Sequence, residues 1–330
     1  MARVFLTGGS GLLGTALVTA LLERGDEVVA LARSDEGAAR LASRGVEVRR
    51  GDVCDERALA EAMGGCELAF NVAGINKFCV SDAAEMMRAN LDGAVAAVRA
   101  ARVAEVPRLV HTSSAATLGE AHGTVADEWT PHRGWYLSRY EESKTLGERA
   151  AAAAAAELGQ DLVCVNPSSV QGPGRAGGTG RFLIAFLDGR LRVFIDTWVS
   201  LVDIEDCVAG HLLAAERGRP GERYLLNGVR MRVTDLLELA ADVAGVRAAP
   251  RLLPRPVATL GGAAAELAFR ARGKHPPVCR EMVRTLLHGH RYDGRRAERE
   301  LGLTYTPPAD TIRRTVDWAR AEGLLSPQPA

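Results

Sequence analysis

The sequence contains no run of about 18 uncharged apolar residues, the shortest segment that readily crosses a membrane as a helix. Its N-terminus passes directly from Met1-Ala2-Arg3 into Val4-Phe5-Leu6. It therefore lacks the long apolar core and cleavage site of a secretory signal. We expect a cytoplasmic protein that has no membrane partner.

An excess of charge of either sign is also lacking, since 41 basic side chains balance 41 acidic ones. Proteins that bind nucleic acid usually carry a clear local or overall basic excess. The balance therefore argues against a nucleic-acid partner and leaves a small molecule as the expected ligand.

Paired cysteines are missing as well, because no C-x-x-C motif occurs and no group of Cys and His has the spacing of zinc ligands. We expect no metal site, and we interpret His288 and His290 as residues of an exposed turn. We interpret the six cysteines as free thiols in a reducing compartment. They are Cys54, Cys66, Cys79, Cys164, Cys207 and Cys279.

The first half of the 330 residues contains a regular alternation of short apolar runs and longer helical patterns. This alternation predicts an α/β fold with right-handed β-α-β crossovers and a doubly wound parallel sheet covered on both faces. The predicted strands are 4–7, 27–31, 46–50, 68–72, 109–112 and 162–166. The predicted helices are 12–22, 36–42, 56–63, 83–104 and 138–158.

After residue 167 the pattern changes to a glycine-rich stretch, 172–180, followed mainly by helical patterns. We expect two interleaved parts that share one cleft: residues 1–170 bind a dinucleotide, and residues 171–330 form a smaller, mostly helical substrate lobe. The alanine tract 150–156 gives one helix a smooth face, which is a candidate surface for a homodimer. The predicted helices here are 182–187, 204–216, 234–243, 257–271, 279–287, 294–301 and 309–322, with strands at 201–203 and 223–226.

Three glycines, at positions 8, 11 and 14, follow the first strand directly and open the first helix. This spacing is typical of a dinucleotide-binding loop, in which the glycines permit a tight turn, close approach of a pyrophosphate and close helix packing. The phosphate binds the free N–H groups at the positive end of the helix. The residues of the predicted loop are Thr7, Gly8, Ser10, Gly11, Leu12, Leu13 and Gly14.

The end of the second strand indicates which dinucleotide is bound. Arg33 follows Ala32 at this strand end, where NAD-binding proteins usually place an acidic residue for the ribose 2′-hydroxyl. A guanidinium suits a 2′-phosphate, so the sequence favours NADP(H) and leaves NAD(H) as the alternative. Asp52, after the third strand, is interpreted either as a contact to the adenine amino group or as a cap of the next helix.

Tyr140 and Lys144 are four residues apart and therefore share one face of a predicted helix. Because a nearby cation favours phenolate, we expect Lys144 to lower the pKa of Tyr140. Ser113 and Ser114 follow the preceding strand, at the edge where open parallel sheets bind their ligands. The four residues together predict a catalytic site for a carbonyl or hydroxyl group.

With these motifs the chain resembles the extended short-chain dehydrogenases/reductases of the epimerase/dehydratase group, in the branch similar to dihydroflavonol reductases and hopanoid-associated epimerases. The resemblance spans nearly the whole chain and implies a Rossmann fold. The motifs that carry it are TGGSGLLG (7–14), NVAG (71–74), HTSSAATLG (111–119), YEESKTLGE (140–148), NPSSVQGPG (166–174) and LVDIEDCVAGH (201–211).

The resemblance implies a role for each matching residue. Tyr140 would donate a proton to a carbonyl oxygen, and Lys144 would hold the nicotinamide ribose. Ser114, in preference to Ser113, would hydrogen-bond the reacting oxygen. The further cofactor contacts that it implies are Val53, Ala73, Gly74, Asn90, Pro167 and Val170.

Departures from the sugar-nucleotide enzymes of this family bear on the substrate. Dehydratases of the family follow the active-site hydroxyl with an Asp-Glu pair, whereas Ala115 and Ala116 follow Ser114 here. The stretch 196–200 also lacks the arginine that often grips a diphosphate. An apolar lining would suit a ring system better, and the candidate pocket residues are Phe78, Met86, Trp135, Phe182, Phe186 and Trp198.

The sequence therefore predicts an NADPH-dependent ketoreductase, or an alcohol dehydrogenase in the reverse direction, for a medium-sized cyclic or aromatic carbonyl compound. One alternative is a sugar or nucleotide-sugar epimerase that retains its NAD throughout. A second alternative is a non-catalytic NADP sensor, against which the presence of both Tyr140 and Lys144 argues.

Overall fold

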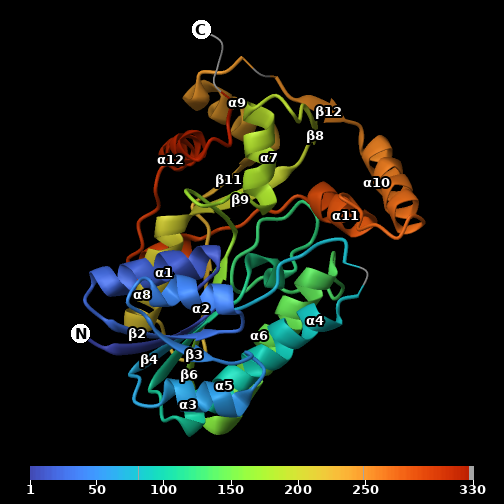
Figure 1. The fold of residues 1–330 in the computed structure, drawn as a ribbon. Coiled ribbons are helices and arrows are strands. Elements are labelled where there is room, and N and C mark those ends of the chain that lie inside the picture. The colour runs from blue at the N-terminus through green and yellow to red at the C-terminus, as the bar shows by residue number, and fades with distance from the viewer. Residues whose placement is uncertain (81, 248, 327–330) are drawn as a thin grey trace.

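The computed structural model describes residues 1–80, 82–247 and 249–326 and is built around a seven-stranded parallel sheet, in the lower part of Figure 1. The strand order β10-β6-β5-β4-β1-β2-β3 reverses beside β1. Doubly wound sheets bind their ligands at such a reversal. The predicted Rossmann sheet is confirmed. Its strands are β1 (Arg3–Thr7), β2 (Glu27–Ala32), β3 (Glu47–Arg50), β4 (Leu68–Asn71), β5 (Arg108–Thr112), β6 (Asp161–Pro167) and β10 (Arg223–Leu226).

Helices cover both faces of this sheet and bury its apolar side chains. One face packs against α1 (Leu12–Glu23), α2 (Asp35–Ala42) and α8 (Ile204–Arg217). The other face packs against α3 (Glu56–Met63), α5 (Gly93–Val103) and α6 (Arg139–Leu158). Because both faces are covered, the inner strands consist almost entirely of apolar residues.

The alanine-rich part of α6 packs within the chain. Ala151 and Ala155 are buried together with the alanines of α5. Near the start of the helix, a Cβ on Gly147 would lie 2.1 Å from the carbonyl O of Asn90, so glycine lets α6 approach the segment that precedes α5. The smooth face predicted at 150–156 therefore serves, at these two positions, an intramolecular helix pair.

The helix predicted at 83–104 is not continuous. It consists of α4 (Ala84–Met87), a π-helical turn (Arg88–Asp92) and α5. Single π turns often occur at functional sites, and this one carries Asn90. The helix predicted at 294–301 is likewise mainly a π turn, Ala297–Leu301. The pattern of apolar residues in the sequence does not indicate either π turn.

Most of the second half of the chain forms the upper part of Figure 1, whereas α8 and β10 lie in the lower part with the seven-stranded sheet. A separate core joins the helices Gly178–Leu187, Val233–Ala244 and Pro308–Ala321. Four of the short strands in this half have no apolar pattern long enough to predict them: β7 (Ser169–Gln171), β8 (Val193–Ile195), β11 (Val229–Arg232) and β12 (Arg251–Leu253). The remaining elements are β9 (Trp198–Asp203), α7 (Gly178–Leu187), α9 (Val233–Ala244), α10 (Arg255–Arg270), α11 (Arg280–His288) and α12 (Pro308–Ala321).

Two of the six cysteines form a disulfide. Cys79, in the segment after β4, is bonded to Cys279 at the start of α11, with the Cα atoms 5.5 Å apart. The expectation that all six are free thiols is wrong for this pair, because residues separated by 200 positions show no spacing that announces their contact. The other four cysteines are free thiols.

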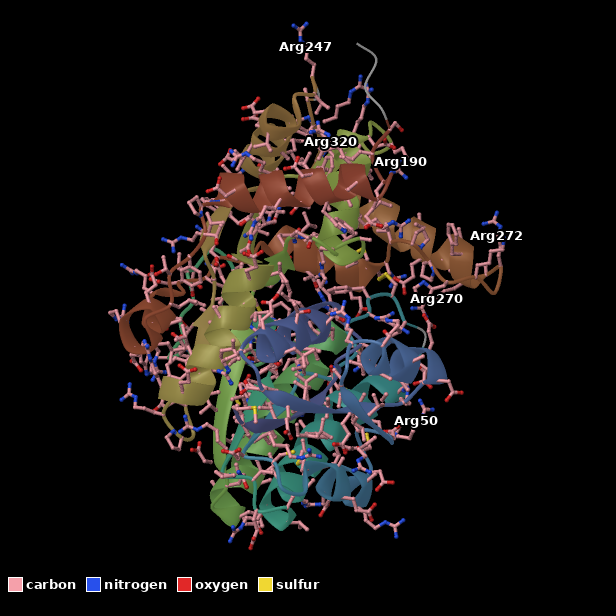
Figure 2. All side chains as sticks on the ribbon, turned by 60° about the vertical axis from the view of Figure 1, so that its left-hand side comes forward. Arg50, Arg190, Arg247, Arg270, Arg272 and Arg320 are labelled. Atoms are coloured by element: carbon pink, nitrogen blue, oxygen red, sulfur yellow. A yellow bond between two sulfur atoms is a disulfide. The ribbon has the colours of Figure 1, made fainter. Side chains whose placement is uncertain are left out.

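Charged side chains are spread over the surface rather than gathered on one face. The arginines labelled in Figure 2 project outward from several elements, among them Arg50 on β3, Arg270 at the end of α10 and Arg320 on α12. Within the described residues, no helix combines the length and the apolar character that a membrane crossing requires.

Candidate active site

The glycine loop between β1 and α1 has the geometry that a dinucleotide phosphate needs. Gly8 has φ +72°, and a Cβ on it would lie 2.7 Å from the backbone N of Ala73. A Cβ on Gly14 would lie 2.1 Å from the carbonyl O of Gly8, so glycine is required where α1 starts against the loop. Gly11, in contrast, is exposed at the N-terminus of α1 and has no side-chain cap there. The first N–H groups of α1 are thus free for a pyrophosphate, and the loop fits the predicted cofactor.

Three arginines surround the part of the site that is expected to hold the adenosine ribose. Arg33 follows β2, is exposed and forms an ion pair of 3.2 Å with Glu85. Arg50 donates a hydrogen bond to the carbonyl O of Arg33 at 2.9 Å, and Arg40 donates one to the carbonyl O of Ser10 in the phosphate loop. The sequence motifs singled out only Arg33, because Arg40 and Arg50 come from α2 and β3.

Two of the predicted cofactor residues serve chiefly to hold the loops in place. Thr7 is fully buried, donates to Asn71 Oδ1 at 2.6 Å and accepts from the N–H of Ala73 at 3.1 Å. Asn90 is buried, accepts from the N–H of Ile75 at 2.8 Å and donates to its carbonyl O at 2.9 Å. Both residues thereby position the segment 73–75 that follows β4.

The remaining predicted cofactor residues lie along the same edge of the sheet. A Cβ on Gly74 would lie 3.1 Å from Asn90 Oδ1, and Val53 packs close to Gly93 at the start of α5. Pro167 ends β6 and Val170 lies in β7.

Asp52 contacts Cys54 and Arg88 in the structure. Its carboxylate accepts from the N–H of Cys54 at 2.9 Å and pairs with Arg88 at 3.3 Å. These contacts, the backbone hydrogen bond first, lower the pKa of Asp52. The cap of α3 is Asp55, which accepts from the N–H of Ala58 at 3.0 Å. The interpretation of Asp52 as the helix cap is therefore wrong.

Tyr140 and Lys144 lie in the first two turns of α6. The helix starts after Ser138, whose side chain accepts from the N–H of Glu141 at 3.1 Å and so caps the first turn. Lys144 is buried and donates from Nζ to the carbonyl O of Thr112 at 2.7 Å. This bond ties α6 to the carboxyl end of β5.

The two serines after β5 point to different sides. Ser113 is buried and donates to the carboxylate of Glu148. Ser114 caps the short 3₁₀ turn Ala115–Leu118, and its hydroxyl lies close enough to the Tyr140 phenol to influence its ionisation. The structure thus brings Ser114 to Tyr140 and occupies Ser113 elsewhere.

The ionisation of the pair differs from the prediction. Burial raises the pKa of Tyr140, and the opposing effects of the Ser114 hydroxyl and the Arg175 guanidinium do not outweigh it. The expected lowering of the Tyr140 pKa by Lys144 is therefore wrong for this structure. Burial also lowers the pKa of Lys144 to about 8. Both groups thus carry their protons in neutral solution.

A buried carboxylate behind the site holds several elements together. Glu148 accepts from Thr117 Oγ1 at 3.0 Å, from Asn166 Nδ2 at 2.6 Å and from Arg223 Nη1 at 3.1 Å. These partners come from the 3₁₀ turn, β6 and β10. With Ser113, Glu148 therefore has four side-chain partners. The sequence shows Glu148 only as part of a motif, and no spacing indicates these partners.

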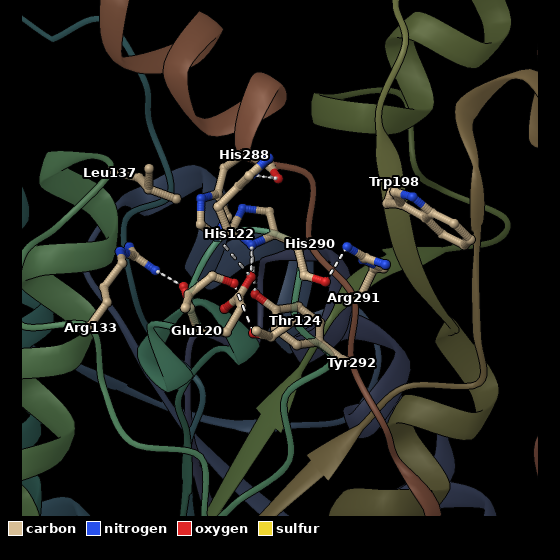
Figure 3. A network of polar contacts seen from close by, with 12 residues as sticks. Glu120, His122, Thr124, Arg133, Leu137, Trp198, His288, His290, Arg291 and Tyr292 are labelled. Atoms are coloured by element: carbon tan, nitrogen blue, oxygen red, sulfur yellow. Dashed lines mark hydrogen bonds and ion pairs between the residues drawn. The ribbon is translucent and has the colours of Figure 1, made fainter.

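A second polar network links the segment after the 3₁₀ turn to the segment after α11 (Figure 3). His290 Nδ1 lies 2.7 Å from Glu120 Oε1, and His288 Nε2 lies 3.5 Å from the same oxygen. Burial alone would raise the pKa of Glu120, but the neighbouring imidazoles of His288 and His290 hold that pKa below its usual range. His288 is 8% exposed, so the expectation of an exposed turn is wrong.

This network also steadies the start of α6. Arg133 pairs with the carboxylate of Glu141 and donates to the carbonyl O of Glu120 at 3.1 Å. The potential ligand atoms of Glu120, His288 and His290 lie within 4.8 Å of one another, a grouping that no spacing in the sequence indicates. Their contacts are those of an acid held between imidazoles.

The family model described as the NAD dependent epimerase/dehydratase family matches residues 4–226. The chain belongs to this family. It is an NAD(P)-dependent oxidoreductase of the extended short-chain type, as the motifs predicted.

Several relatives match over nearly their whole length. The chain is 32% identical to sterol demethylase protein B of Methylococcus capsulatus, with 97% of this chain and 99% of that protein covered. It is 30% identical to a protein of Synechocystis sp. assigned as a dihydroflavonol 4-reductase, with 98% and 96% covered. It is also 30% identical to the 4-hydroxy-2-methyl-3-oxo-4-farnesyl-3,4-dihydroquinoline-1-oxide ketoreductase of Stigmatella aurantiaca, with 94% and 96% covered.

Solved structures show the same fold over the full chain. The crystal structure of gox2253 superposes with a TM-score of 0.86 at 29% identity and covers 99% of this chain and 100% of that one. A nucleoside-diphosphate-sugar epimerase from Pseudomonas aeruginosa superposes with a TM-score of 0.77 at 26% identity, with 98% and 99% covered. A protein named as an epimerase thus shares this architecture.

The apolar residues predicted to line a substrate pocket fall into separate groups. The Phe78 ring lies 6.3 Å from the Tyr140 ring, between centroids. Trp135 and Phe182 are 51% and 39% exposed. Met86 and Phe186 are 2% and 0% exposed, and Phe186 belongs to the core between α7, α9 and α12. Since a core side chain offers no surface to a substrate, the prediction is wrong for Met86 and Phe186.

Trp198, the sixth candidate, lies between cations that the local sequence does not contain. Arg291 and Arg232 stand over its ring at 5.1 and 5.7 Å from the centroid, and Arg232 also pairs with Asp196. The stretch 196–200 has no arginine of its own, but the fold supplies two from β11 and from the segment after α11. The prediction that this stretch lacks an arginine holds, but two arginines from other segments lie beside Trp198.

Proposed function

We propose that this family member is an NADPH-dependent ketoreductase for a medium-sized cyclic or aromatic carbonyl compound. The observation that supports this most strongly is the convergence of Tyr140 and Ser114 beside the carboxyl end of β5. Lys144 is anchored on the carbonyl O of Thr112 at the same edge.

The chemistry follows from the ionisation of these groups. Because burial raises the pKa of Tyr140, its phenol keeps a proton that it can donate to the oxygen of a carbonyl group under reduction. The Ser114 hydroxyl donates a second hydrogen bond to that oxygen as negative charge develops on it. Lys144, whose pKa is about 8, would hold the ribose hydroxyls of the nicotinamide. The bound nicotinamide supplies the hydride.

The preference for NADPH rests on positive charge beside the phosphate loop. Arg33, Arg40 and Arg50 lie around Ser10 and the end of β2, whereas no acidic residue ends that strand. Guanidinium groups bind a phosphate through paired, charge-assisted hydrogen bonds. Arg33 would exchange its present partner Glu85 for the 2′-phosphate.

The side chains after Ser114 argue for reduction rather than elimination. Ala115 is 1% exposed, and neither it nor Ala116 can donate or accept a proton. The phenyl ring of Phe78 beside Tyr140 suits an apolar ring on the substrate. A relative that aligns with 94% of this chain is named as the ketoreductase of a dihydroquinoline-1-oxide.

A nucleotide-sugar epimerase is the second candidate, because Arg232 and Arg291 flank Trp198. Two such cations would suit a diphosphate. An epimerase would keep its nicotinamide bound and would consume none of it overall.

A cofactor-consumption assay tests the proposal. NADPH and NADH oxidation is followed with cyclic ketones, aromatic ketones and sugar nucleotides, and the products are identified. We expect stoichiometric NADPH consumption, and a loss of about 100-fold or more in kcat for Tyr140→Phe. Tyr136→Phe, a neighbouring phenol that packs on His132, is the matched control and should retain turnover.

Two results would contradict the proposal. Unchanged NADPH turnover in Tyr140→Phe would remove the assigned proton donor. Interconversion of a sugar nucleotide without net cofactor consumption would make the protein an epimerase.

A further inference from the structure

Arg175 is a largely enclosed cation without a counter-ion. It lies in the glycine-rich loop between β7 and α7, and its Nε atom is shielded from solvent and has no hydrogen-bond partner. Within the described residues, no carboxylate pairs with its guanidinium, and burial lowers its pKa. Arg133 and Arg223, two other partly enclosed arginines, have acidic partners in Glu141 and Glu148. An unpaired charge that is partly withdrawn from water favours an anionic partner, and Arg175 has such a charge.

The loop around Arg175 is shaped to hold this side chain. Gly178 has φ +57°, and a Cβ on it would lie 2.7 Å from Arg175 Nη2. A Cβ on Gly180 would lie 2.7 Å from Arg175 Cγ. A larger residue at position 178 would displace the guanidinium, whereas a Cβ at position 180 would first meet the carbonyl O of Arg175 at 2.0 Å. The two glycines therefore let the loop fold closely around Arg175 and form a cradle for it.

The cradle lies at the N-terminal end of α7, which begins at Gly178. This ten-residue helix follows Gly177 and has no side-chain cap. Its first N–H groups carry the positive end of the helix dipole. The guanidinium and the helix end therefore add positive potential at one place.

The enclosed cation faces the reaction site. Arg175 is close enough to the Tyr140 phenol for each to influence the charge of the other. The preceding residue, Gly174, packs beside Leu12 at the start of α1, where a Cβ would lie 3.0 Å from Leu12 Cδ1. The loop that contains Arg175 thus adjoins the start of α1, and its cation is close enough to influence Tyr140.

We propose that Arg175 binds a carboxylate of the substrate, so that the substrate is an oxo acid whose carboxylate lies within a few bonds of the reduced carbonyl. The inference deepens the proposed reductase function and rests on it. A carboxylate accepts two hydrogen bonds from one guanidinium, and its position would fix the carbonyl oxygen against Tyr140. The pyrophosphate has its own donors in the first turn of α1, so the anion at Arg175 is assigned to the substrate.

The test compares acids with their neutral derivatives. Wild type and Arg175→Gln are assayed with NADPH on phenylglyoxylate, benzoylacetate and 3-benzoylpropionate and on the methyl ester of each. We expect wild type to prefer at least one acid over its ester. In Arg175→Gln, kcat/KM for that acid should fall by about 10- to 100-fold, because a charged hydrogen bond is lost, while the esters change by less than about threefold. Arg175→Lys should recover part of the preference.

A binding measurement keeps the test independent of turnover. Titration calorimetry compares 3-phenylpropionate with 3-phenylpropionamide on the protein saturated with NADP⁺. Wild type should bind the carboxylate more tightly, Arg175→Gln should bind both alike, and Arg181→Gln, an exposed arginine of the same helix, should behave as wild type.

The outcomes separate the two proposals. Selective carboxylate binding without reduction of any carbonyl compound would support the site and refute the reductase. Equal affinity of wild type for acid and amide would overturn the inference. So would a weakened affinity of Arg175→Gln for NADPH alone with unchanged acid selectivity, since the anion would then be a cofactor phosphate.

Discussion

Replacing Lys144 by methionine should stabilise the protein at neutral pH while abolishing turnover. Lys144 is 5% exposed, and burial lowers its pKa from 10.5 to about 8. At about 1.4 kcal/mol for each pKa unit, burial of the charged ammonium costs the folded state about 3 kcal/mol. The hydrogen bond to the carbonyl O of Thr112 returns about 1 kcal/mol. Methionine has no charge to desolvate, so the net gain in the free energy of unfolding should be about 2 kcal/mol.

The pH dependence gives the sign of this effect. Between pH 8 and 10.5 the unfolded chain binds more protons at Lys144 than the folded chain, so the stability of wild type rises with pH across this window. Below pH 8 the cost of burying the charge is fully present. The advantage of Lys144→Met should therefore be constant below about pH 8 and shrink above it.

The assay is urea denaturation without cofactor at about pH 6.5, 7.5, 8.5 and 9.5. NADPH turnover is measured in parallel. Lys274→Met, which removes an exposed ammonium, is the control and should show neither the gain nor the pH dependence. A variant less stable than wild type at pH 6.5, or an advantage that stays constant to pH 9.5, would refute the reasoning.

Three further predictions concern the cofactor site and the disulfide. Arg33→Ala should lower kcat/KM for NADPH by about 10- to 100-fold, because one charged hydrogen bond is lost, and leave NADH within about threefold; equal losses for both would contradict the NADP preference. In Gly14→Ala the new Cβ would meet the carbonyl O of Gly8, so calorimetry should show loss of dinucleotide binding together with about 1–3 kcal/mol of destabilisation. Cys79→Ser opens a covalent link between residues 200 positions apart, so its free energy of unfolding should fall by about 2–5 kcal/mol. A reductant should lower that of wild type equally and leave the variant unchanged, and no effect of reductant on wild type would show that the bond contributes nothing.

Much of the site could be predicted because its motifs are contiguous and sit at element boundaries. The loop that contains Gly8 and Gly14 adjoins a strand and a helix, so local backbone geometry explains its glycines. The four-residue spacing places Tyr140 and Lys144 on one helix face, and the end of β5 places Ser114 beside them. The alternating apolar runs likewise predict the parallel sheet, because covered strands need apolar residues on both faces.

The charge environment could not be predicted in the same way, because it depends on side chains from distant segments. Burial outweighs the neighbouring groups at Tyr140 and raises its pKa, opposite to the expectation from the motif. The order of apolar residues along the chain also does not distinguish a pocket residue from a core residue, so the prediction that Phe186 lines a substrate pocket is wrong.

The sequence by itself determined the sheet, the glycine loop after β1 and the shared helix face of Tyr140 and Lys144, since each depends on neighbours within one turn or one strand. Only the tertiary structure decided that Cys79 meets Cys279 and that His288 is buried beside Glu120. The tertiary structure also places Arg175 near Tyr140, and within the described residues no carboxylate pairs with its guanidinium. These contacts join residues far apart in the chain, and the packing of the complete fold selects them.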